Sequence, residues 1–132
     1  YGLAITTSPR TPPEVVKIIA EKLKEKLSNN KAILWKGEGR NPYLGYLAHA
    51  DFIIATSDSV NMISEAAATG KPVYTIELNG GSNKFTRFHK AMYEAKITRP
   101  FADIIEHWSY KIPNDTVNAA SEIKLRRILK NA

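Results

Sequence analysis

The segment that decides the fold reads DFIIATSDSVNMISEAAATGKPVYTI and spans residues 51–76. Residues 51–56 are an apolar run short enough to form a buried strand, and residues 59–69 have small side chains at helical spacing. Gly70 then stands where a helix is expected to end, and a second strand-like run covers residues 72–76. This order of strand, helix, glycine and strand predicts two parallel strands joined by a helix.

The same alternation extends along the chain. Further strands are predicted at residues 2–7 and 32–35, and helices at residues 12–27, 43–49 and 83–95, with a last helix beginning at Asn114 or Asp115. Thr11 to Glu14 predict a capping box with proline at the first helical position, and Ser82 is the natural N-cap of the helix at 83–95. In the short helix at 43–49, Leu44 is expected to face inward. The predicted fold class is α/β: a Rossmann-like three-layer domain with a parallel sheet.

Composition limits the protein class. The 132 residues fit one domain, and 43% hydrophobic with 24% charged residues is typical of a soluble globular chain. The absence of cysteine excludes disulfides, thiol catalysis and thiolate metal sites. No stretch is long and apolar enough to span a bilayer, which leaves peripheral membrane contact open. Because the chain opens at Tyr1 directly into an apolar run, we expect the natural protein to continue upstream.

The net charge of +6 favours an anionic partner. Nucleic acid is not expected, because the sequence carries neither a basic stripe interleaved with aromatic residues nor an RNA-binding signature. Metal is not expected either, since there is no Asp-x-Asp motif and His49, His89 and His107 lack metal-ligand spacing. No cofactor is predicted. His89 shares a helix start with Lys84 and Arg87 and could grip an anion there, although a charged helix face explains it equally well.

In open parallel sheets, ligands bind beyond the carboxyl ends of the strands. The loops at these positions are rich in hydroxyls, glycines and cations, which together with helix-start amides hold phosphate oxygens. Glu65, further along the helix at 59–69, can accept two hydrogen bonds from a ribose diol, although a plain surface position is the alternative. The predicted nucleotide-sugar site comprises Ser8, Arg10, Asn41, Tyr43, Ser57, Asp58, Ser59, Ser64, Glu65, Gly80, Gly81, Ser82 and Lys84. Arg10 could equally satisfy loop carbonyls, and no catalytic residue is assigned.

Two motifs resemble the donor-binding motif in the C-terminal domain of GT-B glycosyltransferases, such as the peptidoglycan N-acetylglucosaminyltransferase. They are Ser64-Glu65-Ala66-Ala67 and Gly70-Lys71-Pro72; the Asp58-Ser59 turn is also similar to that of the heptosyltransferases. The resemblance implies that residues 1–132 are the C-terminal, nucleotide-sugar-binding half of a two-domain protein. The N-terminal domain, which this chain does not contain, would supply the acceptor site and the base. One departure is that many GT-B enzymes have glycine near Ser59, where this chain has serine and valine.

A wider set of motifs resembles the mitochondrial-fission ELM family. The set comprises Thr6-Thr7-Ser8-Pro9-Arg10-Thr11-Pro12, Asn41-Pro42-Tyr43, Asp58-Ser59-Val60, the run from Ser64 to Tyr74, Gly80-Gly81-Ser82, Arg87-Phe88-His89 and Trp108-Ser109-Tyr110. The family has bacterial members, some labelled nucleoside-diphosphate-sugar epimerases. The resemblance implies a place in the bacterial cytoplasm, or at the mitochondrial surface in a eukaryote.

Three functions stay open at this point. The leading one is nucleotide-sugar binding for a metal-independent glycosyltransferase that is active only when joined to its N-terminal domain. The others are a non-catalytic interaction module and a hydrolysing, non-NAD epimerase. An NAD-dependent epimerase is disfavoured, because the first strand is followed by Thr-Ser-Pro-Arg instead of a glycine-rich turn and no tyrosine has lysine four residues later.

Overall fold

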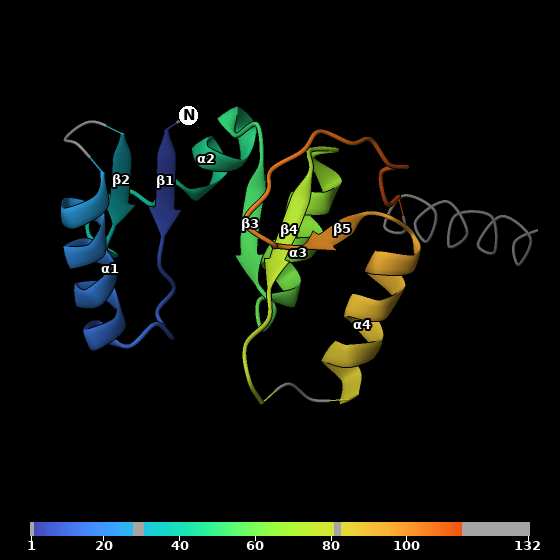
Figure 1. Ribbon diagram of the computed structural model, residues 1–132, viewed down its shortest axis with the longest axis horizontal. Coiled ribbons are helices and arrows are strands. Elements are labelled where there is room, and N and C mark those ends of the chain that lie inside the picture. Colours follow the sequence, from blue (N-terminus) through green and yellow to red (C-terminus); the bar gives the residue numbers. More distant parts are fainter. Residues whose placement is uncertain (1, 28–30, 81–82, 115–132) are drawn as a thin grey trace, which may run out of the picture. The chain divides into compact units, whose positions relative to one another are not determined.

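The computed structural model describes residues 2–27, 31–80 and 83–114. It divides into two compact units, Tyr1–His49 and Ala50–Ala132. The helices and strands of each unit are labelled in Figure 1. All three strand pairings in the described part are parallel. The fold class is therefore α/β, as predicted, with parallel sheets and helices of the Rossmann-like type. The assignment of the whole chain to one domain stays a prediction.

The first unit is a strand–helix–strand crossover followed by a short helix. Its elements are β1 (Leu3–Thr6), α1 (Pro13–Lys26), β2 (Ala32–Trp35) and α2 (Tyr43–His49). Leu3 pairs with Ala32 and Thr6 with Trp35, so both strands end at the same edge. At that edge the Thr7 hydroxyl donates to the Trp35 carbonyl over 3.2 Å, which joins the two loops that follow the strands.

The capping box predicted for α1 is not formed. The helix has Pro12 as its N-cap, and no side chain caps it. Thr11 lies one residue too early, and its hydroxyl instead accepts the Ser8 N–H at 3.1 Å. The inward position predicted for Leu44 is also wrong, because that side chain is 74% exposed.

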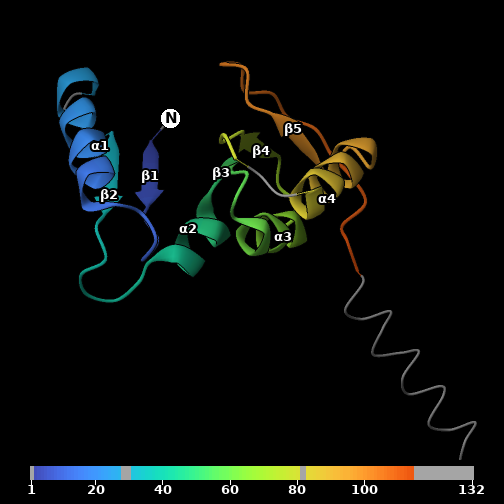
Figure 2. The same cartoon turned by 90° about the horizontal axis from the view of Figure 1, so that it is seen from below.

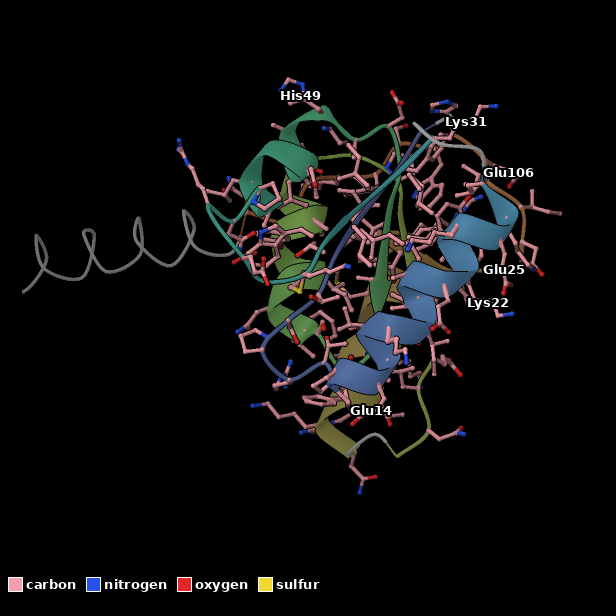
Figure 3. The ribbon with its side chains drawn as sticks, turned by 90° about the vertical axis from the view of Figure 1, so that its left-hand side faces the viewer. Glu14, Lys22, Glu25, Lys31, His49 and Glu106 are labelled. Carbon is pink, nitrogen blue, oxygen red and sulfur yellow. The ribbon has the colours of Figure 1, made fainter. Side chains whose placement is uncertain are left out.

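The outer side of α1 is charged. Figure 3 shows Glu14, Lys22 and Glu25 along it, and Lys22 pairs with Glu25 at 3.1 Å. Both partners are more than 60% exposed, so the pair contributes little stability. The helix therefore accounts for part of the chain's charge as a solvated surface.

The second unit is a three-stranded sheet with two helical crossovers. Its elements are β3 (Ile53–Thr56), α3 (Val60–Ala68), β4 (Val73–Ile76), α4 (Asn83–Glu94) and β5 (Thr98–Pro100), with the strand order β3-β4-β5. Figure 2 shows α3 and α4 on one side of this sheet. β4 is central, and its Val73, Tyr74 and Thr75 are at most 3% exposed. The core of the unit thus lies between β4 and α3, where Ile63, Ala66 and Ala67 are also buried.

The strand β5 was not predicted. It has three residues, two of them Arg99 and Pro100, which hide any apolar pattern; proline is tolerated there because the described sheet ends at this strand. The strand is recognised instead by its pairing with β4 and by the burial of Thr98. Thr98 is 2% exposed opposite Val73, and the Phe101 N–H donates to the Thr75 carbonyl at 2.9 Å.

After β5, residues 101–114 cover the unit without regular secondary structure. The Tyr74 hydroxyl accepts the Glu106 N–H at 2.7 Å, and the indole of Trp108 packs edge-on against the Tyr74 ring. Further along, the Tyr110 hydroxyl reaches the Lys71 carbonyl at the end of the α3 crossover. Because Tyr74 meets this segment while the next residue, Thr75, meets Tyr93 of α4, the segment and α4 lie on opposite faces of the sheet.

Gly70 ends α3 as predicted. Its φ of +74° is the left-handed conformation that glycine adopts without strain. Beyond Asn114, the predicted final helix lies outside the described residues, as does Ser82 with its predicted capping role.

Candidate functional site

A groove of about 620 Å³ lies at the carboxyl ends of β3 and β4. The last residues of these strands, Thr56 and Ile76, are paired, so the loops that follow them begin side by side. The lining comes from those two loops and one face of α4; it comprises Ser57, Asp58, Glu77, Leu78, Asn79, Gly80, Phe85, Thr86, His89, Lys90, Tyr93 and Glu94. Its volume falls within the range of roughly 300 to 1,000 Å³ that is usual for small-molecule sites.

Ser57 connects the three parts of this lining. Its N–H donates to the Ile76 carbonyl and its hydroxyl oxygen accepts the Leu78 N–H, each at 2.9 Å. Its carbonyl accepts a hydrogen bond from Nε2 of His89 at 2.7 Å. Ser57 therefore ties the two loops to α4, and its hydroxyl donates no hydrogen bond to any of the described residues.

The contact with Ser57 decides how His89 carries its proton. A carbonyl oxygen can only accept, so Nε2 bears the hydrogen, and in the neutral ring Nδ1 is then an acceptor. Nδ1 is buried and has no hydrogen-bond partner among the described residues. His89 thus lines the groove, with its Nε2 hydrogen already used within the protein, and its contact with an anion stays a prediction.

The start of α3 adjoins the groove at Asp58. Ser59 is the N-cap residue, but no side chain caps the helix, and the first bond of the helical ladder runs from the Ile63 N–H to the Ser59 carbonyl at 2.9 Å. The three amides of residues 60–62 precede that bond and carry the positive partial charge of a helix start. The Ser59 hydroxyl lies 3.5 Å from an oxygen of Asp58. This end of α3 offers backbone donors beside one carboxylate.

Ser64 and Glu65 lie further along α3 and do not line the groove. The Ser64 hydroxyl donates to the Val60 carbonyl at 2.9 Å, a bond common in helices, so only its acceptor capacity is left for a ligand. Glu65 is exposed. It lies five residues beyond Val60, which is about 7.5 Å along the helix axis, and shares a face with Asn61 at i,i+4 spacing.

The remaining predicted residues are placed as follows. In the first unit, the Ser8 hydroxyl accepts the Arg10 N–H at 3.2 Å, and the Asn41 side chain accepts the Tyr43 N–H at 3.0 Å at the start of α2. These bonds shape the turns after β1 and before α2. The guanidinium-bearing Arg10 is exposed.

In the second unit, Ser57, Asp58 and Gly80 are brought together in the groove, with Ser59 next to it. Lys84 is exposed in the first turn of α4 and does not line the groove; Gly81 and Ser82 lie outside the described residues.

The contribution of α4 was missed from the sequence, apart from His89. The α4 residues of the groove form two rows at a spacing of four: Phe85, His89 and Tyr93 in one, Thr86, Lys90 and Glu94 in the other. This spacing places both rows on adjacent lines of one helix face. The sequence shows which residues share a face of the helix, but it does not show which face lies against the strand ends. Glu77 had a clearer signal, because it follows β4 directly.

Two further observations bear on the chemistry. Among residues 2–27, 31–80 and 83–114, no group of three or more histidines or carboxylates is placed to hold a metal ion. In the same part of the chain, no helix is long and apolar enough to cross a membrane.

Comparison with known proteins adds the family context. The family model described as "Mitochondrial fission ELM1" matches residues 1–127. The chain is 41% identical over 126 residues to the mitochondrial fission protein ELM1 of Arabidopsis thaliana, covering 93% of this chain and 29% of that protein. It is 42% identical over 88 residues to an uncharacterized protein of Rickettsia prowazekii, covering 64% of this chain and 25% of that protein. No solved structure matches.

Proposed function

This chain belongs to the Mitochondrial fission ELM1 family, and we propose that it binds a nucleoside diphosphate sugar at the carboxyl ends of β3 and β4. The observation that carries the proposal is the groove of about 620 Å³ directly beside the uncapped start of α3. One feature offers room for a sugar and the other offers free amides for phosphate oxygens.

The three parts of the ligand would lie at three places. Its diphosphate lies against the amides of residues 60–62, its ribose diol faces Glu65, and its sugar extends into the groove toward α4. The distance of about 7.5 Å along the axis from Val60 to Glu65 suits this division, because a ribose follows directly on a diphosphate. The Asp58 carboxylate would repel phosphates at the helix start. We therefore assign Asp58 to contacts with the sugar and the backbone amides to contacts with the phosphates.

The activity of the full-length protein is part of the same proposal. The chain spans less than a third of the length of the relatives it matches. We propose transfer of a glycosyl group without metal, with the acceptor site and the base supplied by a part of the full-length protein outside these 132 residues. Helix-start amides can stabilise the leaving diphosphate, which is the role metal ions fill elsewhere.

Calorimetric and thermal-shift titration of the full-length protein with UDP, GDP and ADP sugars tests the proposal. We expect saturable binding of at least one of them. Glu65→Ala should weaken that binding by roughly 1 to 3 kcal/mol, the cost of losing a charged hydrogen-bond partner. The matched control is Glu25→Ala, also exposed on a helix, which should leave the affinity unchanged.

If no sugar nucleotide produces heat or a thermal shift, the proposal fails and the non-catalytic interaction module is favoured. Binding with an unchanged affinity in Glu65→Ala would remove Glu65 from the site alone. Analysis of products separates transfer from epimerisation, because a hydrolysing epimerase releases an epimerised free sugar without an acceptor.

A further inference from the structure

We propose that the groove selects its sugar by charge: it accepts neutral sugars and amino sugars and discriminates against sugars that carry a carboxylate, such as uronates. This inference rests on the proposed function, since it assigns the sugar of a nucleotide sugar to the groove. It adds the class of sugar and the residues that determine it.

The groove carries mostly negative charge, opposite in sign to the net charge of the chain. The chain carries a net charge of +6, yet the groove is lined by the carboxylates of Asp58, Glu77 and Glu94 and by one ammonium, that of Lys90. Lys90 is paired with Glu94 at 3.8 Å, so its charge is directed at a carboxylate of the same face. Among the described residues, Asp58 and Glu77 form no ion pair, and both lie just beyond the ends of β3 and β4, where the sugar would enter.

The neutral groups point the same way. Nδ1 of His89 is a buried acceptor that the described residues leave unpaired, because Nε2 spends its hydrogen on Ser57. Nδ1 is covered and is not counted as a ligand contact, so the ring offers an incoming carboxylate no free N–H donor. Phe85 and Tyr93 add apolar lining for the C–H face of a sugar ring. An incoming carboxylate therefore meets negative charge and no histidine donor.

The size of the discrimination follows from electrostatics. Asp58 and Glu77 are exposed, so solvent reduces their repulsion of a third carboxylate, and we expect a difference on the order of ten-fold in affinity. Screening acts over about 8 Å at an ionic strength of about 0.15 M and over longer distances at lower salt. The discrimination should therefore widen as salt is lowered, which a purely steric preference would not do.

The test uses pairs of ligands that differ only in the sugar carboxylate: UDP-glucose with UDP-glucuronate, and GDP-mannose with GDP-mannuronate. Each is titrated into the full-length protein by calorimetry, with UDP and GDP alone as references. In the pair whose neutral sugar binds, we expect the affinity for the uronate to be about ten-fold lower than for the neutral sugar. Glu77→Gln should narrow that ratio to a few-fold, and Lys90→Gln should widen it. Both variants should unfold at the wild-type temperature by circular dichroism; Glu94→Gln, at an exposed site, substitutes for Glu77→Gln if the latter does not fold.

The outcomes separate the two proposals. A uronate that binds as tightly as its neutral partner, or a ratio unmoved by both variants and by salt, overturns the charge selection while the nucleotide-sugar site stands. If neither nucleotide sugars nor UDP and GDP bind, the proposed function fails and the charge selection fails with it.

Discussion

Replacing Tyr110 with phenylalanine removes the bond that holds the segment after β5 to the end of α3. The hydroxyl lies 2.7 Å from the Lys71 carbonyl and 3.0 Å from the Ala67 carbonyl, so its single proton is shared between two acceptors. Ala67 is fully buried, although its carbonyl also accepts a backbone N–H from Gly70. The Ala67 carbonyl keeps the Gly70 N–H as a partner, whereas the Lys71 carbonyl loses the Tyr110 hydroxyl. Tyr110→Phe should therefore lower the free energy of unfolding by about 1 to 2 kcal/mol.

The same hydroxyl makes this cost depend on pH. Burial raises the pKa of Tyr110 from 10.0 to about 12. A pKa that is higher in the folded state means that the unfolded chain loses this proton first. The contribution of the hydroxyl is therefore fully present below pH 10 and is lost as the pH rises toward 12. The ring is partly exposed, so we expect the wild type to lose no more than about 1 kcal/mol per pH unit through this group.

Urea unfolding between about pH 8 and pH 11.5 measures both effects. The chain has two tryptophans, so a Trp35→Phe background leaves Trp108 as the fluorescent reporter of the unit that contains Tyr110. The difference between wild type and Tyr110→Phe should be constant up to about pH 10 and shrink above it. Tyr46→Phe, in α2, is the control and should change the stability by less than about 0.5 kcal/mol. A difference below about 0.5 kcal/mol at pH 8, or one that does not change up to pH 11.5, would refute the reasoning.

Two further substitutions test the second unit. Gly70→Ala should cost about 1 to 2 kcal/mol in urea unfolding, because the φ of +74° favours glycine over alanine and the new Cβ would lie 2.9 Å from Ile112. Gly45→Ala, in α2 with open space around it, should instead stabilise by roughly 0.5 to 1 kcal/mol; two changes of the same sign would contradict this assignment. Thr75→Val breaks the 2.6 Å bond between the Thr75 and Tyr93 hydroxyls and should lower the unfolding midpoint by the equivalent of about 1 to 2 kcal/mol. An unchanged midpoint would show that Tyr93 finds another partner.

The part of the fold that the sequence predicted best is the one with the strongest local signals. β3, α3 and β4 agree with the predicted segments within a few residues, because two short apolar runs flank a small-residue helix that ends at Gly70. β5 was missed because its identity depends on pairing with Val73, a contact from distant sequence. The capping box failed for a local reason: Pro12 became the N-cap, which left Thr11 outside the helix.

The candidate site was predictable in location and less so in detail. Parallel strands place their following loops at one edge, and Ser57, Asp58 and Gly80 do line one groove there; their contact with a ligand stays a prediction. The roles of individual atoms were not predictable. The Ser57 carbonyl and the His89 ring meet across 32 positions of sequence, and no spacing rule foretells that bond. The function of Glu65 in binding stays a prediction.

The most direct test of the nucleotide-sugar site is a backbone-amide NMR titration of the protein with the sugar nucleotide that binds in calorimetry. We predict the largest saturable shift changes at the amides of residues 60–62, with further changes at Gly80 and at the groove face of α4. Saturable changes confined to α1 or to residues 101–114, with the start of α3 unaffected, would contradict the account.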